Sequence, residues 1–307
     1  MHTASMIVLT TGTDDRLPYL DKLIRSISIQ TTKPRELVVA SETSSDKLIE
    51  LFGKHFNRAE NHRIIATGCW NKCKTANRTI RRSRGSIVFL LEDDLVLEEG
   101  FVEQILGTFD LDPLIGSVYS RCIWVYPEGA NSAKGLKGLL ARLVSRLSLH
   151  KSLLPRKVKK LGNRLYEVPV FTMSVACRRE ALYSAGLYDE NIAEPISGED
   201  YDLALRIGRA GYRIVLNTDA VSYHFTRQVH RRSLKLAKDP KYLMGLNESE
   251  VYFMTKNREV LGVYVLPHAI YRILESVAWA IRTKSVKAPV YGISGALKGL
   301  ARGLRSS

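Results

Sequence analysis

The sequence predicts an α/β protein in which parallel strands alternate with crossover helices. Two observations carry this prediction: short apolar runs rich in Val and Ile, and intervening segments whose apolar residues recur at the helical period. A third is the chain length, since 307 residues can bury a full core as one large domain or two smaller ones. The composition, 45% hydrophobic and 25% charged, is that of a folded protein.

The N-terminal half is expected to alternate strands and helices regularly. The predicted strands cover residues 6–11, 35–42, 62–67 and 86–91, and the predicted helices cover 19–30, 46–56 and 69–83. A strand–helix–strand unit favours parallel pairing, because the crossover helix returns the chain to the same end of the sheet. The carboxyl ends of these strands should therefore share one edge, which is where ligands bind in open α/β sheets.

The C-terminal half predicts a strand at 116–127, strands followed by a helix within 166–190, and a final strand at 212–224. Between them, a helix is entered through Glu199, Asp200 and Asp202. Acidic side chains are favoured in a first helical turn by the helix dipole, so capping alone could account for these three residues.

Three adjacent carboxylates, Glu92, Asp93 and Asp94, follow the strand at 86–91 directly. Like charges this close raise one another's pKa or require a cation. The residues alone leave two explanations open: a solvated loop tip, or a site that holds something positive.

Three stretches, in this order, resemble the family 2 glycosyltransferases, which are inverting enzymes of the GT-A fold that use nucleotide-activated sugars. They are "SISIQTTKPRELVVASETSSD", "SRGSIVFLLEDDLVLEEGF" and "AGLYDENIAEPISGEDYDLALRIGRAGYRIVLNTDAVSYH", and the resemblance covers roughly residues 5–226. It implies a nucleotide-diphospho-sugar transferase domain with a Rossmann-like mixed sheet. The chain would then carry amphipathic helices after this domain.

The resemblance also implies a metal site. Asp94 matches the metal-binding acid of the family's D-x-D motif, whereas Glu92 stands where the first Asp is usual. Asp93 and Glu92 would contact the nucleotide or the ion, which hard oxygen ligands predict to be Mn²⁺ or Mg²⁺. His224 matches a histidine that reaches the metal or the diphosphate in many members, although a lone histidine is more often structural.

Catalytic and nucleotide-binding roles follow from the same motifs. Asp200 matches the family's catalytic base, with Glu199 beside it to hold the acceptor or tune the base, and Asp202 is expected to cap the helix. The nucleotide would be contacted by further residues in the N-terminal half, namely Thr11, Glu42, Lys74 and Asn77.

The charge is strongly basic, at +15 with a pI near 9.7, which indicates a polyanionic neighbourhood. No acidic residue falls between Glu128 and Glu167, and the leucines of residues 136–147 follow the helical period. A basic amphipathic helix of this kind is typical of membrane-surface binding, although a helix packed on the domain would look similar. Residues 259–307 are expected to form helices that lie on a membrane, because Pro267, His268, Arg272 and Glu275 interrupt the apolar run that spanning requires.

These observations predict four parts: a nucleotide-sugar-binding half at 1–128, a basic amphipathic insertion at 129–165, an acceptor-binding and catalytic half at 166–258, and a membrane-associating tail at 259–307. The predicted function is transfer of a sugar from a UDP-, GDP- or dTDP-linked donor to a lipid-linked or cell-surface glycan. The first residues lack a signal-peptide pattern, so the enzyme is expected in the cytoplasm, peripheral on the inner face of the membrane.

Two alternatives stay open. A nucleotidyltransferase on a related scaffold is the first, although the early loop "TTGTDDRLP" lacks the usual glycine-rich phosphate loop. A catalytically inactive protein that binds nucleotide sugars or nucleic acid is the second. Nucleic acid is not expected as a partner, because aromatic residues are not interleaved with the basic run. The sugar, the base of the donor, the linkage and the oligomeric state do not follow from these patterns.

Overall fold

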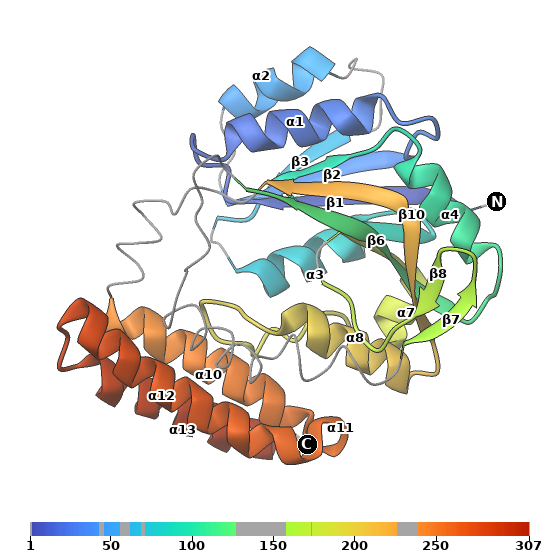
Figure 1. The fold of residues 1–307 in the computed structure, drawn as a ribbon. Helices are drawn as coiled ribbons and strands as arrows, with labels where there is room; N and C mark the ends of the chain where they lie inside the picture. The colour runs from blue at the N-terminus through green and yellow to red at the C-terminus, as the bar shows by residue number, and fades with distance from the viewer. Residues whose placement is uncertain are drawn as a thin grey trace. The chain divides into compact units, whose positions relative to one another are not determined.

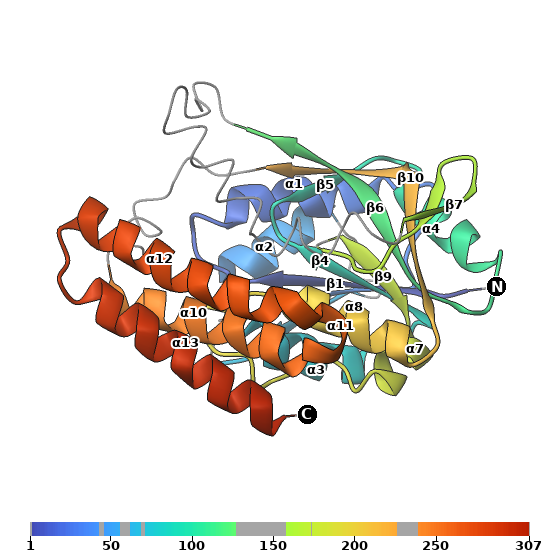
Figure 2. The same cartoon turned by 60° about the horizontal axis from the view of Figure 1, so that its bottom comes forward.

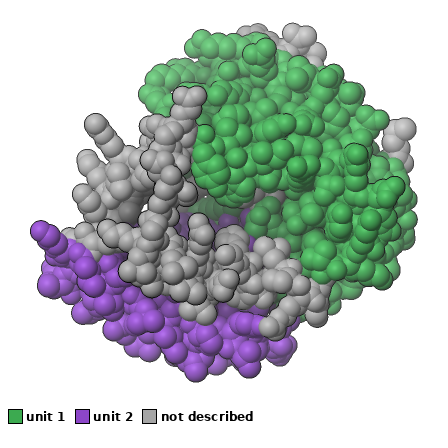
Figure 3. All heavy atoms as spheres, viewed as in Figure 1, with its two compact units in different colours: residues 1–126, 157–188, 203–226 green, residues 127–156, 189–202, 227–307 purple. Residues whose placement is uncertain are grey.

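The computed structural model describes residues 2–42, 46–55, 62–68, 71–126, 158–172, 174–225 and 239–306. The chain divides into two compact units, shown in separate colours in Figure 3. Unit 1 comprises residues 1–126, 157–188 and 203–226, and unit 2 comprises residues 127–156, 189–202 and 227–307.

Unit 1 is built on one mixed sheet, in which the described strands have the order β3-β2-β1-β4-β9-β6-β10-β8-β7, with β5 paired to β10 (Figures 1 and 2). The strands are β1 (Ala4–Thr10), β2 (Glu36–Ser41), β3 (His62–Ala66), β4 (Ile87–Glu92), β5 (Leu95–Leu97), β6 (Ile115–Val125), β7 (Lys159–Gly162), β8 (Leu165–Glu167), β9 (Val175–Arg178) and β10 (Arg213–Phe225). β3, β2, β1 and β4 run parallel, and β9 joins β4 and β6 as an antiparallel strand.

Helices cover both faces of this sheet (Figure 1). The main core lies under α1 (Leu17–Ser28), α2 (Asp46–His55) and α4 (Phe101–Phe109), which pack onto alternate residues of β1, β2 and β4. α3 (Lys72–Arg82) and α7 (Arg179–Ser184) lie on the opposite face. Because β1 is buried along its whole length, it reads as a continuous apolar run, as expected of a central parallel strand.

Unit 2 contains three long helices, α10 (Pro240–Lys256), α12 (Val265–Thr283) and α13 (Ala288–Arg305). The short α11 (Arg258–Leu261) and a 3-10 turn at Gly262–Tyr264 connect α10 to α12. α13 packs along α10, and α12 packs against both (Figures 1 and 2). Among the described residues, one helical stretch, Arg258–Ile281, is long and apolar enough to cross a membrane.

The predicted elements agree with the structure to within a few residues, including the position of β4 as the fourth strand. One expectation about the tail does not hold: despite Pro267, His268, Arg272 and Glu275, the stretch Arg258–Ile281 is long and apolar enough to cross a membrane. α12 is continuous and holds Pro267 in its first turn, where no backbone donor is needed. The predicted helix at 136–147 lies outside the described residues. The four-part division stays a prediction, and β7 begins inside the range assigned to its basic insertion.

α8 (Glu199–Arg209) begins with the acidic residues that the sequence singled out. Its first four residues belong to unit 2 and the rest to unit 1.

Candidate active site

The candidate site lies at the carboxyl edge of the sheet in unit 1. The register pairs Leu9 of β1 with Glu92 of β4, and Thr10 with Ser41 of β2, so the ends of these parallel strands lie side by side. β4 ends at Glu92, and the turn at residues 93–94 leads into β5. The acidic triplet therefore occupies the edge at which open α/β sheets bind ligands.

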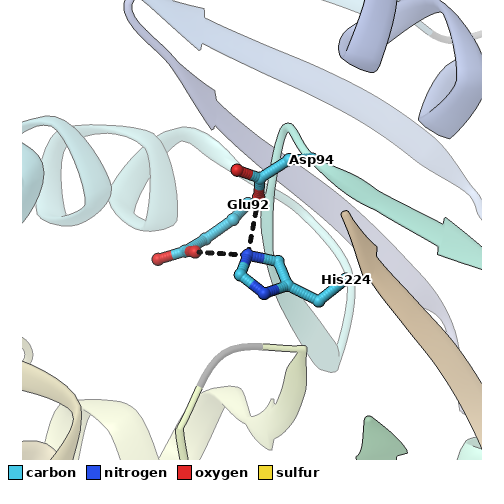
Figure 4. Close-up of side chains that lie close together, drawn as sticks. All are labelled: Glu92, Asp94 and His224. Atoms are coloured by element: carbon cyan, nitrogen blue, oxygen red, sulfur yellow. Dashed lines mark ion pairs between the residues drawn. The ribbon is translucent and has the colours of Figure 1, made fainter. Parts of the chain in front are cut away.

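The pairing of β5 with β10 brings His224 to Asp94. These strands are antiparallel, with His224 opposite Leu95, and the backbone N–H of Phe225 donates to the carbonyl of Asp94 at 3.0 Å. Nε2 of His224 lies 3.1 Å from Oδ1 of Asp94 and 4.0 Å from Oε2 of Glu92 (Figure 4). Strand register thus joins two predicted metal ligands that are distant in sequence.

The three carboxylates of the triplet face basic side chains from three elements. Lys72, in the first turn of α3, places Nζ 3.0 Å from Oε1 of Glu92. Arg16, in the loop after β1, donates from Nε to Oδ2 of Asp93 at 2.6 Å and from Nη2 to Oδ2 of Asp94 at 3.2 Å. With the histidine on Asp94, the mutual repulsion of the triplet is offset inside unit 1.

Burial and charge oppose each other at the Asp94–His224 pair. Burial favours the neutral acid, but the hydrogen bond with His224 and the charge of Arg16 outweigh it and hold the pKa of Asp94 below its ordinary value. Burial likewise disfavours the imidazolium, but Asp94 and Glu92 outweigh it and raise the pKa of His224. The site is therefore strongly favourable to positive charge.

The side chains fit a divalent cation. Among the described residues, Glu92, Asp94 and His224 each offer one ligand atom, and these atoms lie within 4.8 Å of one another. An octahedral ion with ligands near 2.1 Å separates its ligand atoms by about 3 to 4.2 Å, so small side-chain rotations are enough. Trp124 packs edge-on against the His224 ring, with centroids 4.4 Å apart, and restricts its rotation.

Two of the residues predicted to contact the nucleotide lie at the same edge. Thr11 follows β1 directly, half-buried, with its hydroxyl 3.0 Å from that of Thr13. Glu42 follows β2 directly and is also half-buried. Asp93 is turned toward β1, where the hydroxyl of Thr10 donates to it at 2.5 Å. Asp93 therefore holds the Arg16 loop against the strand, and its contact with a nucleotide stays a prediction.

The two predicted residues on α3 are placed differently. Lys74 is exposed, whereas Lys72, which the sequence reasoning missed, reaches Glu92. Asn77 is buried, and its amide donates to the carbonyl of Tyr188 and accepts from the Tyr188 N–H, both at 2.9 Å. Asn77 thus fixes the loop after α7, and the nucleotide contacts of Lys74 and Asn77 remain predictions.

Arg16 was also missed by the sequence reasoning, although one signal pointed to it. It lies in the loop that follows β1, and β1 is the parallel neighbour of β4. A basic residue in the loop after the adjoining strand is well placed to reach carboxylates at the end of β4. Lys72 lacked such a signal, because its side-chain direction depends on where α3 begins.

Glu199 and Asp200 are buried in the first turn of α8. The carboxylate of Asp202 contacts the end of α10: Lys256 lies 3.0 Å from Oδ1, and Nδ2 of Asn257 donates to Oδ1 at 3.0 Å. Its expected capping of α8 stays a prediction. Asp189 accepts from the same Lys256 and from the hydroxyl of Tyr252, both at 2.6 Å. Within unit 2, α10 therefore anchors the start of α8.

Comparisons with known proteins agree with this fold and site. The family model described as "Glycosyltransferase like family 2" matches residues 4–241. Because the match extends over most of the sequence, the chain belongs to the family 2-like glycosyltransferases. No curated protein sequence matches the chain.

Solved structures similar to the chain confirm the expected GT-A fold. GalNAc-T7 with UDP, GalNAc and Mn²⁺ has a TM-score of 0.56 at 14% identity, covering 92% of this chain and 58% of that one. The mannosyltransferase PcManGT from Pyrobaculum calidifontis, in complex with GDP-Man and Mn²⁺, has a TM-score of 0.57 at 17% identity, with coverage of 97% and 87%. S. aureus TarS residues 1–349 with UDP-GlcNAc has a TM-score of 0.53 at 13% identity, with coverage of 97% and 90%.

Proposed function

We propose that this chain is a metal-dependent, inverting glycosyltransferase that uses a nucleoside-diphosphate sugar. The observation that carries the proposal is the convergence of Glu92, Asp94 and His224 at the carboxyl edge of the sheet. Two of the similar structures contain Mn²⁺ together with UDP or GDP-mannose, which supports a donor of this class.

The carboxylates of Glu92 and Asp94 and the imidazole of His224 would hold Mn²⁺ or Mg²⁺. A bound ion of this kind neutralises the charge that develops on a departing diphosphate. Arg16 and Lys72 supply fixed positive charge beside the same carboxylates, and their donor N–H groups suit phosphate oxygens. Their contacts with Asp93, Asp94 and Glu92 keep both side chains at the edge of the sheet.

Inversion by a single displacement needs a base that takes the proton of the acceptor hydroxyl as the new bond forms. We assign this role to Asp200, with Glu199 beside it to orient the acceptor. The assignment is supported by the motif and by the fixed start of α8. A positioned carboxylate base contributes roughly 10²–10⁴-fold to a rate.

The proposed acceptor is a lipid-linked or cell-surface glycan, reached by a cytoplasmic enzyme that is peripheral on the inner face of the membrane. Support comes from the basic excess of the sequence and from the exposed apolar residues of α12 and α13. A role in polysaccharide biosynthesis follows from an acceptor of this kind.

Calorimetric titration of UDP, GDP and dTDP, each with and without Mn²⁺, tests the donor site. One nucleotide should bind tightly only with the ion, and Asp94→Ala should weaken that binding at least tenfold. Asp110→Ala, which removes an exposed carboxylate, is the matched control and should bind like wild type. Metal-independent binding, or equal binding by Asp94→Ala, would contradict the proposal.

The catalytic assignment is tested with the donor so identified. Asp200→Asn should bind the nucleotide like wild type while transfer falls roughly 10²–10⁴-fold. The anomeric configuration of the product, read by NMR, decides between inversion and retention. Release of pyrophosphate in place of a nucleoside diphosphate would establish the nucleotidyltransferase alternative.

A further inference from the structure

The three-helix bundle of unit 2 has a polar interior. Asn247 of α10 is fully buried, and its Nδ2 donates to the hydroxyl of Ser276 and to the carbonyl of Gly292, both at 3.0 Å. Nε of Arg272 donates to Oδ1 of Asn247 at 2.9 Å. His268 of α12 is also buried and meets Glu250 of α10 at 3.0 Å. α12 thus turns His268, Arg272 and Ser276 inward.

The inner face of α13 consists of residues with little or no side chain. They are Ala288, Gly292, Gly295, Ala296, Gly299 and Gly303. A Cβ atom at Gly295 would lie 2.1 Å from the carbonyl oxygen of Met244, and one at Gly299 would lie 2.5 Å from that of Glu248. The two backbones therefore approach closely along a stripe of small residues, a mode of helix packing that is common in membranes.

The outer faces of the same helices carry large apolar side chains. On α12 they are Leu266, Ile270, Leu274, Val277 and Ile281, and on or just before α13 they are Val286, Val290, Ile293, Leu297, Leu300 and Leu304. Both rows recur at the helical period, and α12 and α13 pack against each other. We call these two rows the outer apolar face. It reverses the usual order of a water-soluble bundle, which buries its leucines and exposes its charges.

Basic residues accompany the outer apolar face. From Ser276 to Ser306 the sequence contains no Asp or Glu. Lys284 and Lys287 are exposed in the connection between α12 and α13, and Lys298 and Arg305 are exposed on α13 itself. A surface that joins apolar rows to unopposed positive charge is complementary to an anionic lipid layer.

We propose that the outer apolar face inserts into the interfacial layer of an anionic bilayer, with α12 and α13 lying along the membrane plane. Two features indicate that α12 and α13 lie along the membrane surface and do not cross the membrane. α12 is covered on its inner side by α10, whose Glu250 and Asn247 bind its charged residues. In addition, the exposed Lys298 lies inside α13, whereas a spanning helix confines its cations to its ends.

The inference bears on the proposed acceptor, but its test uses neither donor nor acceptor, so its failure would leave the transferase proposal standing. Sedimentation with vesicles of equal parts phosphatidylcholine and phosphatidylglycerol is compared with sedimentation with phosphatidylcholine alone. Wild type should bind the anionic vesicles much more tightly. Replacing Lys284, Lys287 and Lys298 together with Gln should weaken binding by about fivefold per charge.

The apolar contribution is tested with Leu274→Ser and Leu297→Ser, whose side chains are 61% and 59% exposed. Each should weaken vesicle binding on the order of tenfold, because the variant no longer transfers this apolar side chain from water into the membrane. The matched control is Leu111→Ser with Leu114→Ser in unit 1, where exposures of 66% and 55% are similar. The control should bind like wild type, and all variants should unfold at the wild-type temperature because these residues are exposed.

Ile270 belongs to the outer apolar face, so Ile270→Trp places a depth reporter there. Lipids brominated on their acyl chains should quench the fluorescence that Ile270→Trp adds over wild type in the vesicle-bound protein. Equal binding of both vesicle types, or binding that ignores Leu274→Ser and Leu297→Ser, would overturn the proposal. A dimer in solution that these variants dissociate, together with no vesicle binding, would assign the face to a second copy of the chain.

Discussion

The ammonium group of Lys256 lies 3.0 Å from Oδ1 and 3.1 Å from Oδ2 of Asp202. Asp202 is fully buried, two residues after Asp200, so α10 fixes the helical turn that carries the proposed base. Lys256 also binds Asp189, and it is thus shared between two carboxylates of unit 2. Lys256 touches no substrate in this proposal, but it controls the geometry of Asp200, which does.

Replacing Lys256 with Met is expected to leave two buried carboxylates without their cation. The free energy of unfolding should fall by about 3–5 kcal/mol, as when one partner of a buried pair is removed. Transfer should lose kcat at least tenfold while the dissociation constant of the nucleotide stays unchanged, since Lys256 acts on α8 and not on the donor site. Lys256→Arg should restore part of kcat. Lys241→Met, an exposed change on the same helix, is the control for both measurements.

Acid is expected to destabilise unit 2 through Asp189. Burial favours its neutral form, but hydrogen bonds from Lys256 and Tyr252 outweigh burial and lower its pKa to about 2. A depressed pKa in the folded state gives stability that is fully present above the ordinary value near 3.8 and is lost as the pH falls toward 2. Between about pH 5 and pH 2, wild type should lose up to about 2 kcal/mol more than Asp189→Asn in urea unfolding. Parallel pH profiles for the two proteins would refute this account.

Arg16 is expected to matter for folding as well as for the site. Its side chain is the cation that faces Asp93, a carboxylate with 1% exposure. Arg16→Met should lower the free energy of unfolding by about 3–5 kcal/mol, and the double change with Asp93→Asn should recover part of this loss, because no buried charge is then left alone. Urea denaturation of the single and double variants gives the coupling free energy between Arg16 and Asp93. Additive effects would show that Asp93 does not depend on Arg16.

Gly295, in the stripe of small residues on α13, is expected to leave no room for even one methyl group. Gly295→Ala would place Cβ against the carbonyl of Met244, and the resulting overpacking should cost about 1–3 kcal/mol. Gly107→Ala is the control, because Gly107 lies inside α4 with nothing within 4 Å of a Cβ atom. That change should stabilise the protein by about 0.5–1 kcal/mol. Thermal unfolding of both variants should therefore shift in opposite directions.

Much of the fold followed from the sequence, because its signals are local. The β-branched runs that form β1, β2 and β4 are bounded by turn residues, and the apolar positions of α1 recur at the helical period. The end of β4 could therefore be placed, and with it the acidic triplet. The contact between His224 and Asp94 needed more, because it depends on the register of β5 against β10, and only the family resemblance suggested it.

Side-chain direction was the limit of sequence reasoning. Lys72 and Lys74 are two residues apart, and the phase of α3 decides that Lys72 meets Glu92 while Lys74 is exposed. On α12, Arg272 was interpreted as a break in an apolar run, yet it is buried against Asn247. Periodicity identifies a helical face, but the partner that covers each face is set by tertiary packing.

The stripe of small residues on α13 also limits how this helix can change during evolution. Its inner positions tolerate little beyond glycine and alanine, because a larger side chain would add atoms where two backbones meet. The outer positions are free in shape and constrained only to remain apolar. Deleting one residue inside α13 would turn the rest of the helix by about 100°. Branched side chains would then face the carbonyl oxygens of α10, so the bundle has one rotational setting in which it closes.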